Sequence, residues 1–256
     1  MPVSHNRAPA LIPIPLREQR RTVQGQAVGN ILLAQIPQLE FLKIRPHLEF
    51  LNFELAAPLQ RQGRPITAVY FLNGGIASMI VETSDGRSVE VGVAGREEMI
   101  GLQLAGGLTE LTYNVFVQAP CTGFRVSAEA IKGLLPTMPW LNRILMRRLA
   151  IRTVELAQNA GCNRLHSVAQ RLARWLLMTQ DRINSDVIST THDFLAKMIG
   201  TDRATVSVKL EELESRQIVR RGRGSVVICD RAHLQRRACE CYRLVRRFNS
   251  ELDINL

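Results

Sequence analysis

Between Thr190 and Leu213, small polar and basic side chains flank a tight turn in a pattern suited to contacting DNA. Gly200 lies where the chain must reverse, since glycine tolerates positive φ at little cost. Asp202 can accept backbone N–H bonds as the N-cap of a helix that starts there. That helix begins with side chains placed as in a recognition helix that meets base edges in the major groove: Arg203, Ala204, Thr205, Ser207 and Val208. For this segment alone, an ordinary helical hairpin in a core is the alternative.

The elements around this turn are predicted to be two short helices and a basic hairpin. Apolar residues recur at helical spacing on both sides of Gly200, at Leu195, Met198 and Ile199 and then at Val206, Leu210 and Leu213. Two β-branched runs within 218–228 flank an Arg-Gly-Arg-Gly tip that needs unusual backbone angles. Three arginines lie at or beside the tip, and the planar fork of each can bond two phosphate oxygens: Arg220, Arg221 and Arg223. They suit a phosphate-clamping wing, so the pattern predicts a winged helix-turn-helix rather than solvated turn residues alone.

The charge is concentrated in the same half of the chain. The 256 residues carry a net charge of +10, and residues 142–256 hold 21 Lys+Arg against 12 Asp+Glu, whereas residues 1–141 hold 12 against 11. A basic patch attracts any polyanion. Together with the predicted winged helix-turn-helix, it favours duplex DNA, where neutralised phosphates supply much of the affinity.

The remaining composition predicts a cytoplasmic protein without a metal. No apolar run approaches the roughly 20 residues that span a bilayer, and five scattered cysteines indicate reduced thiols. Cys239-x-Cys241 has no second ligand pair near it in the sequence, and residues two apart on a helix point to different sides. We therefore expect these two thiols to be structural. The histidines show no ligand spacing, so neither a metal nor a cofactor is predicted: His5, His47, His166, His192 and His233.

The front half has the texture of an antiparallel barrel or sandwich. Short runs rich in Val, Ile, Tyr and Phe alternate with Gly turns, and strands are predicted at Ala68–Leu72, Ile76–Glu82, Ser88–Val93 and Asn114–Gln118. Before and after them, short helices are predicted at Ile36–Leu42, Leu48–Leu51 and Ala128–Leu135.

Helices are also predicted for much of the back half. A long helix over about 140–161 carries a near-heptad apolar stripe, traced by Leu141, Leu145, Leu149 (or Arg148), Arg152 and Leu156 and widened by Ile144, Ile151 and Val154. Such a stripe can be plain core, but a long helix between two domains is a natural dimer seam, which we predict here. Two more helices are expected, at His166–Gln180 and, rich in arginine, at Asp230–Phe248. The expected domains are a flexible tail (1–30), a sensory β-domain (31–138), a dimerisation helix (139–165), a winged helix-turn-helix (166–230) and a C-terminal helix (231–256).

Over residues 36–248 the chain resembles the Crp/Fnr family of bacterial transcription regulators. The resemblance rests on segments in both halves: 68–75, 85–92 and 98–101 in front, and 171–177, 181–182, 194–196, 203–206 and 230–242 behind. It implies an α+β protein with an N-terminal cyclic-nucleotide-binding-like β-roll (a jelly roll), a long dimerisation helix and a C-terminal winged helix-turn-helix. Oxygen-sensing relatives hold an iron–sulfur cluster near the N-terminus, but no cysteine precedes Cys121 here.

The effector site departs from the family pattern. Members that bind cyclic AMP follow a phosphate-cassette Gly with Glu, and a later Arg-Ser/Thr-Ala neutralises the phosphate. Here Gly101 is followed by Leu102, and the later positions are Tyr113 and Asn114. Burying a phosphate without a cation costs several kcal/mol, so binding of cyclic AMP by the usual mode is not expected. These four residues remain a tentative effector pocket, although Tyr113 and Asn114 also suit ordinary positions of the roll.

The resemblance also implies how the recognition helix meets its operator. Arg203 would contact guanine, the commonest specific pairing of arginine. Ala204 and Val208 stand where the cyclic-AMP regulators have Glu and a second Arg, and their methyl groups would suit thymine. Thr191 and Thr205 hold positions that contact phosphates, whereas Asp202 suits only a cap.

The leading hypothesis is a homodimeric, sequence-specific transcription regulator that binds a near-palindromic duplex. RNA polymerase would be a further partner if the protein activates transcription. The alternative is a ligand-binding signalling module whose basic half binds another anionic partner. An enzyme is not expected, because the sequence shows no Gly-rich phosphate loop, His-x-x-x-His pair or acid dyad in a plausible cleft.

Overall fold

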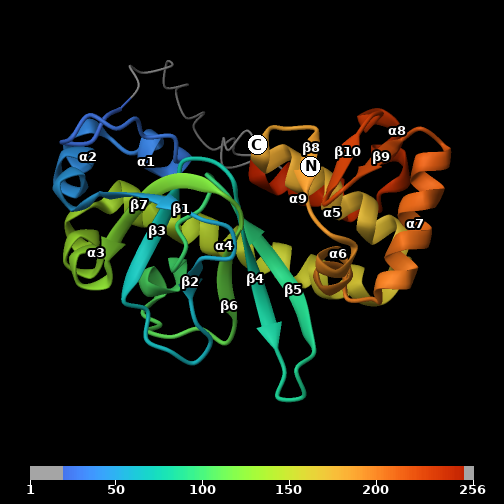
Figure 1. Cartoon of the computed structure of the whole chain (residues 1–256). Coiled ribbons are helices and arrows are strands. Elements are labelled where there is room, and N and C mark those ends of the chain that lie inside the picture. Colours follow the sequence, from blue (N-terminus) through green and yellow to red (C-terminus); the bar gives the residue numbers. More distant parts are fainter. Residues whose placement is uncertain (1–19, 251–256) are drawn as a thin grey trace, which may run out of the picture.

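The computed structural model describes residues 20–250, which form two lobes joined by one long helix (Figure 1). The first lobe contains α1 (Ile31–Gln35), α2 (Gln38–Ile44), β1 (Glu49–Phe53), β2 (Pro58–Gln60), β3 (Ala68–Leu72), β4 (Ile76–Glu82), β5 (Ser88–Ala94), β6 (Asn114–Ala119), β7 (Cys121–Ser127) and α3 (Ala128–Leu134). Short 3-10 turns follow α2, β5 and α3, at Arg45–His47, Leu102–Gly106 and Leu135–Thr137. Helix α4 (Pro139–Leu165) then runs behind both lobes.

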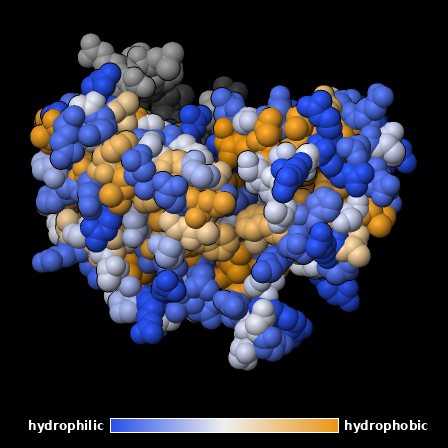
Figure 2. Space-filling view, viewed as in Figure 1, coloured by the Kyte–Doolittle hydropathy of each residue, from blue (hydrophilic) through white to orange (hydrophobic). Residues whose placement is uncertain are grey.

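The strands of the first lobe form two antiparallel sheets, ordered β1-β7-β3 and β2-β6-β4-β5. Buried apolar residues of both sheets pack into one core, which also receives α1, α2 and the first half of α4. The expected jelly roll is confirmed. The β4–β5 hairpin projects beyond the roll, and its tip is hydrophilic in Figure 2.

The second lobe has a core of its own. It contains α5 (Val168–Ile183), β8 (Val187–Ser189), α6 (His192–Ile199), α7 (Arg203–Ser215), β9 (Val219–Gly222), β10 (Ser225–Ile228), α8 (Arg231–Arg237) and α9 (Cys241–Ser250). Strands β8, β10 and β9 form an antiparallel sheet in that order. The apolar faces predicted on α6 and α7 are buried against α5 and this sheet, so the predicted helix-turn-helix and wing are both present.

The described part of the N-terminal segment is packed, not flexible. Arg20 is buried and donates to the carbonyl oxygens of Leu33, at 2.6 Å, and Ile36. Asn30 is fully buried, caps α1 and donates to the carbonyl oxygen of Glu98 at 3.0 Å. The predicted tail was therefore too long by residues 20–30, while its residues 1–19 lie outside the described range.

Two predicted helices take a different form. The segment predicted as a helix at Leu48–Leu51 lies mostly in strand β1, because it pairs along its length with β7, where Glu49 opposite Arg125 forms a 2.8 Å ion pair. The single C-terminal helix predicted over 230–248 is two helices, α8 and α9, separated at residues 238–240. No described helix is long and apolar enough to cross a membrane.

Most of the stripe predicted as a dimer seam on α4 faces the chain's own interior, whereas its members Val154 and Leu156 are each 37% exposed. Leu141 and Leu145 are fully buried in the core of the roll, and Arg148 and Arg152 are buried against Glu98. These positions form the inner face of α4, so they are core rather than seam. The opposite face of α4 is exposed.

Candidate nucleic-acid interface and effector site

The turn between α6 and α7 has the geometry expected from its sequence. Gly200 ends α6 with φ of 64°, in the left-handed region that favours glycine. The Asp202 carboxylate accepts from the Thr205 N–H at 2.8 Å and from the Thr205 hydroxyl at 2.7 Å, so it caps α7. Hydrogen bonds donated by Thr205 hold the pKa of Asp202 below its usual range. The carboxylate that opens α7 thus stays ionised and fixes the helix start.

The first turns of α7 present an exposed row of the predicted base-reading side chains. Arg203 and Ala204 are exposed, and the side chain of Val208 is 52% accessible. Ser207 is only half-exposed: its hydroxyl donates to the carbonyl oxygen of Arg203 at 2.9 Å and lies 2.8 Å from His192 Nδ1. Three of the four predicted base-reading side chains, those of Arg203, Ala204 and Val208, are therefore exposed to solvent.

Arg203 is held loosely by its neighbours. Its guanidinium lies 3.5 Å from the Asp193 carboxylate, and both side chains are well exposed. Exposed pairs of this kind contribute at most about 1 kcal/mol. The guanidinium can therefore leave Asp193 for an external acceptor at little cost.

The wing arginines fall into two groups. Gly224 has φ of 73° and closes the two-residue tip between β9 and β10, with exposed Arg223 beside it. Arg220 is also exposed, and neither it nor Arg223 forms an ion pair within residues 20–250. Arg221 instead donates to Glu214 at 2.6 Å and ties the wing to the end of α7.

The two predicted phosphate-contacting threonines serve as caps within the chain. The hydroxyl of Thr191 accepts from the Phe194 N–H at 3.2 Å and caps α6. Thr205 donates to Asp202, as described above. Thr191 remains exposed and Thr205 half-exposed, both at helix N-termini, where backbone N–H groups favour an anion.

The tentative effector residues lie in the roll and are engaged by their own chain. Leu102 is 1% exposed. The hydroxyl of Tyr113 accepts from Gln103 Nε2 at 2.7 Å, and the amide oxygen of Asn114 accepts from the Gln62 N–H at 3.0 Å. Burial raises the pKa of Tyr113 to about 12, so it stays neutral. The polar groups of Tyr113 and Asn114 are thus hydrogen-bonded within the roll.

A buried charge cluster connects the roll to the inner face of α4. Arg148 donates to Glu98 at 2.8 Å, to Glu155 at 2.9 Å and to the amide oxygen of Asn249 at 2.8 Å. Arg152 pairs with Glu98 and lies 3.2 Å from Glu155. Burial disfavours all these charges, but Arg152 and Arg148 outweigh it at Glu155 and hold the pKa of that carboxyl at about 2. Two arginines thus balance two glutamates with no charge left over.

The two lobes contact each other through polar bonds on β5 and the loop after it. Trp175 Nε1 donates to Glu90 at 3.1 Å, and Arg182 Nε donates to Glu97 at 2.8 Å. Phe116 of the roll meets Phe194 of α6 edge to face, with ring centroids 6.4 Å apart. The second lobe therefore rests against the roll.

Glu90 makes this contact sensitive to pH. Burial raises its pKa from 4.5 to about 7, although Ser78, Arg174 and Trp175 favour the ionised form. A raised pKa means that its stabilising contribution is complete below pH 4.5 and is lost as pH rises through 7. We expect Glu90→Gln to make thermal unfolding less dependent on pH and to stabilise the protein at pH 8 by no more than about 3 kcal/mol. Equal pH dependence in both proteins, followed by calorimetry from pH 5 to pH 8, would contradict this assignment.

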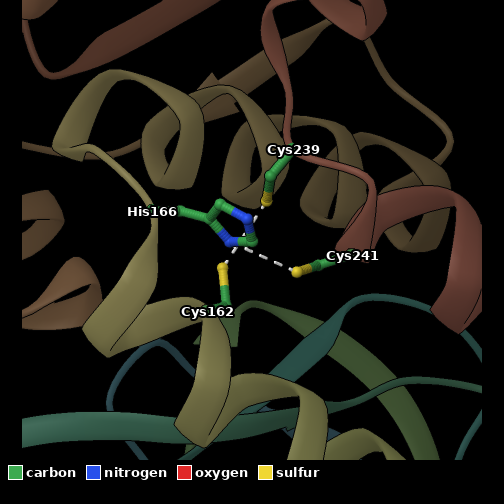
Figure 3. A group of neighbouring side chains, drawn as sticks. All are labelled: Cys162, His166, Cys239 and Cys241. Carbon is green, nitrogen blue, oxygen red and sulfur yellow. Dashed lines mark hydrogen bonds between the residues drawn. The ribbon is translucent and has the colours of Figure 1, made fainter.

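Four side chains for which no metal binding was predicted from the sequence meet at the C-terminal end of α4 (Figure 3). The donor atoms of Cys162, His166, Cys239 and Cys241 all lie within 4.8 Å of one another. The prediction that Cys239 and Cys241 diverge was wrong, because Cys239 lies in the break between α8 and α9 and not on a helix. The second pair of side chains, Cys162 and His166, lies far from Cys239 in the sequence and comes from the end of α4. Its signal was the Cys162–His166 spacing of four residues, which brings the last turn of α4 and its C-cap residue His166 together, because the His166 N–H donates to the Cys162 carbonyl oxygen.

Each of the two lobes matches a known protein domain. Residues 50–137 match the model of the cyclic nucleotide-binding domain, and residues 170–237 match that of the Crp-like helix-turn-helix domain. The chain is 23% identical over 198 residues to the CRP-like cAMP-activated global transcriptional regulator of Mycobacterium tuberculosis, a match that covers 75% of this chain and 88% of the relative.

Solved structures show the same fold. FixK2 from Bradyrhizobium japonicum superposes with a TM-score of 0.64 at 15% identity, covering 75% of this chain and 98% of that one. The c-di-GMP responsive global regulator CLP of Xanthomonas campestris gives 0.63 at 18% identity, covering 75% and 99%. The relatives are transcription regulators and not enzymes. With a cyclic nucleotide-binding domain in front and a Crp-like helix-turn-helix behind, this chain belongs to the Crp/Fnr family of transcription regulators.

Proposed function

We propose that this regulator binds a near-palindromic duplex operator as a homodimer and reads it with α7. The observation that carries the proposal is the exposed row of Arg203, Ala204 and Val208, at the start of a capped helix and near a wing tip with two arginines that form no ion pair within residues 20–250. Guanidinium suits guanine and methyl groups suit thymine. Arg220 and Arg223, with the N-termini at Thr191 and Thr205, supply phosphate contacts.

The dimer is proposed to form through the outer face of α4. Because the inner stripe is core, the available surface is the exposed side at helical spacing: Met146, Ala150, Thr153, Val154 and Ala157. Met146 and Val154 are 39% and 37% exposed, and Leu156 beside them is 37% exposed. Two copies joined along this face would place two α7 helices in successive major grooves.

The proposal excludes cyclic AMP in the usual binding mode. Leu102 stands buried where those relatives have a ribose-binding glutamate, and Tyr113 and Asn114 bring no cation to the phosphate position. The two arginines that α4 turns toward the roll are neutralised by Glu98 and Glu155. The effector region would therefore hold either a different ligand or none.

The same proposal places the protein in the cytoplasm, where bacterial operators are. It includes RNA polymerase as a partner at promoters that the protein activates.

The experiment is selection of binding sites from random duplex DNA with the purified full-length chain, without any cyclic nucleotide. A two-fold-symmetric consensus with half-sites one helical turn apart is expected. Binding that depends on salt but yields no consensus would overturn the sequence-specific proposal and favour a basic module with another anionic partner.

The wing makes a separate prediction about phosphate contacts. Arg223→Ala should weaken binding to all sequences alike and reduce the slope of log affinity against log salt by about 2 for the dimer, because one phosphate contact is lost in each protomer. Arg221→Ala removes the same charge from the same hairpin, but its guanidinium is bound to Glu214, so a smaller change in slope is expected. Equal slopes for wild type and Arg223→Ala in a salt titration would show that Arg223 does not contact a phosphate.

A further inference from the structure

The group formed by Cys162, His166, Cys239 and Cys241 (the Cys3His cluster) joins two breaks in the chain. Cys162 and His166 lie at the end of α4, and His166 directly precedes the residue that caps α5. Cys239 and Cys241 lie between α8 and α9 and at the start of α9. The three thiols are at most 3% exposed, and the His166 side chain is 17% exposed. The cluster is thus an enclosed site at the junction of the long helix and the DNA-binding lobe.

The spacing of the donor atoms fits one tetrahedral ion. The Sγ atoms of Cys162 and Cys239 are 3.5 Å apart, as are Cys241 Sγ and His166 Nδ1. Zinc bonds of about 2.3 Å to sulfur and 2.0–2.1 Å to nitrogen give tetrahedral edges of about 3.5–3.8 Å. All donor pairs lie within 4.8 Å, so small side-chain movements complete the geometry. A multi-iron cluster spreads its ligands over several irons and needs wider spacing.

Neither a disulfide nor a set of neutral thiols uses all four side chains. A disulfide between Cys162 and Cys239 needs the two sulfurs at about 2.05 Å, and it leaves the Cys241 thiol and the His166 imidazole without a role. As neutral thiols, three weak donors would share one imidazole in a buried space. Thiolates and a neutral imidazole around a divalent cation use all four donors.

The surroundings also match those of a metal site. His166 Nε2 lies 3.2 Å from the Glu240 carboxylate, which leaves Nδ1 directed at the sulfurs (Figure 3). A carboxylate on the far nitrogen commonly orients a metal-binding histidine. Gln158 Nε2 donates to Cys241 Sγ at 2.9 Å, as expected beside a thiolate.

We propose that Cys162, His166, Cys239 and Cys241 bind one Zn²⁺ ion. Binding releases the three thiol protons to solvent. The ion fastens the end of α4 to the α8–α9 junction and so fixes the orientation of the DNA-binding lobe on the long helix.

The test starts from metal analysis of the purified full-length protein. One zinc per chain is expected, and reconstitution of the apoprotein with Co²⁺ should give the absorption of tetrahedral cobalt with thiolate ligands. Cys162→Ser and Cys239→Ser should lose the zinc and the thiolate absorption. Cys121→Ser and Cys229→Ser are the matched controls, because these thiols lie outside the cluster. Both controls should keep one zinc per chain.

A gentler variant separates metal binding from folding. Glu240 is exposed, so Glu240→Gln should fold normally yet bind zinc about 10–100-fold more weakly in competition with a chelator. Wild-type affinity in Glu240→Gln would overturn its role in orienting His166. A wild-type protein that neither contains zinc nor gives the cobalt–thiolate absorption would overturn the site itself, as would iron with acid-labile sulfide or a Cys162–Cys239 disulfide.

Discussion

Replacing Arg148 with alanine is expected to lower the free energy of unfolding by about 3–5 kcal/mol. Arg148 is fully buried and is bound to Glu98, Glu155 and Asn249. Without it, only Arg152 remains to balance two buried carboxylates, and an uncompensated buried charge costs far more than the net worth of the pair. Urea unfolding of both proteins at the same protein concentration measures the change and removes concentration as a variable.

The control for this variant is on the same helix. Arg143 is exposed and stacks over Trp140 with 5.5 Å from guanidinium carbon to ring centroid, so Arg143→Ala should cost no more than about 1 kcal/mol. If Arg148→Ala cost as little as Arg143→Ala, the charge cluster would be solvated and would not hold α4 against the roll.

Replacing Arg203 with alanine is expected to weaken binding to the selected operator by about 1–3 kcal/mol for each half-site and to relax the preference at one base pair in each half-site. The physical reason is loss of two hydrogen bonds to one base edge, since only a weak exposed pair with Asp193 competes for the guanidinium. Binding isotherms on the operator and on its single-base variants, at one salt concentration, measure both effects.

Arg216→Ala is the matched control for base reading. It removes the same charge from the other end of α7, where the helix ends and the chain leaves toward the wing. It should leave the base preference unchanged. If Arg203→Ala weakened binding to every sequence equally and kept the consensus, its role would be phosphate contact rather than base reading.

The winged helix-turn-helix could be predicted because its determinants are local. Gly200 at positive φ and Asp202 as a cap lie within three residues of each other, and both have the predicted conformation. Strands β3 and β4 match their predicted bounds, since alternating apolar runs between Gly turns mark them clearly. The base-reading and phosphate-contacting roles themselves remain predictions.

The errors arose where distant segments decide the outcome. Glu49–Phe53 is a strand because β7, more than 60 residues later in the chain, pairs with it. The first part of the apolar stripe of α4 is core because Glu98 and α9 cover its charged position Arg148. The Cys3His cluster joins positions whose contact spans 77 residues, and no local pattern shows that they meet.

Dimeric operator binding through α7 is tested by a hydroxyl-radical footprint of the wild-type protein on its selected operator. A dimer that reads DNA with two α7 helices predicts two protected windows, related by a two-fold axis and centred about 34 Å apart. A single window, or protection spread evenly along the duplex, would contradict it.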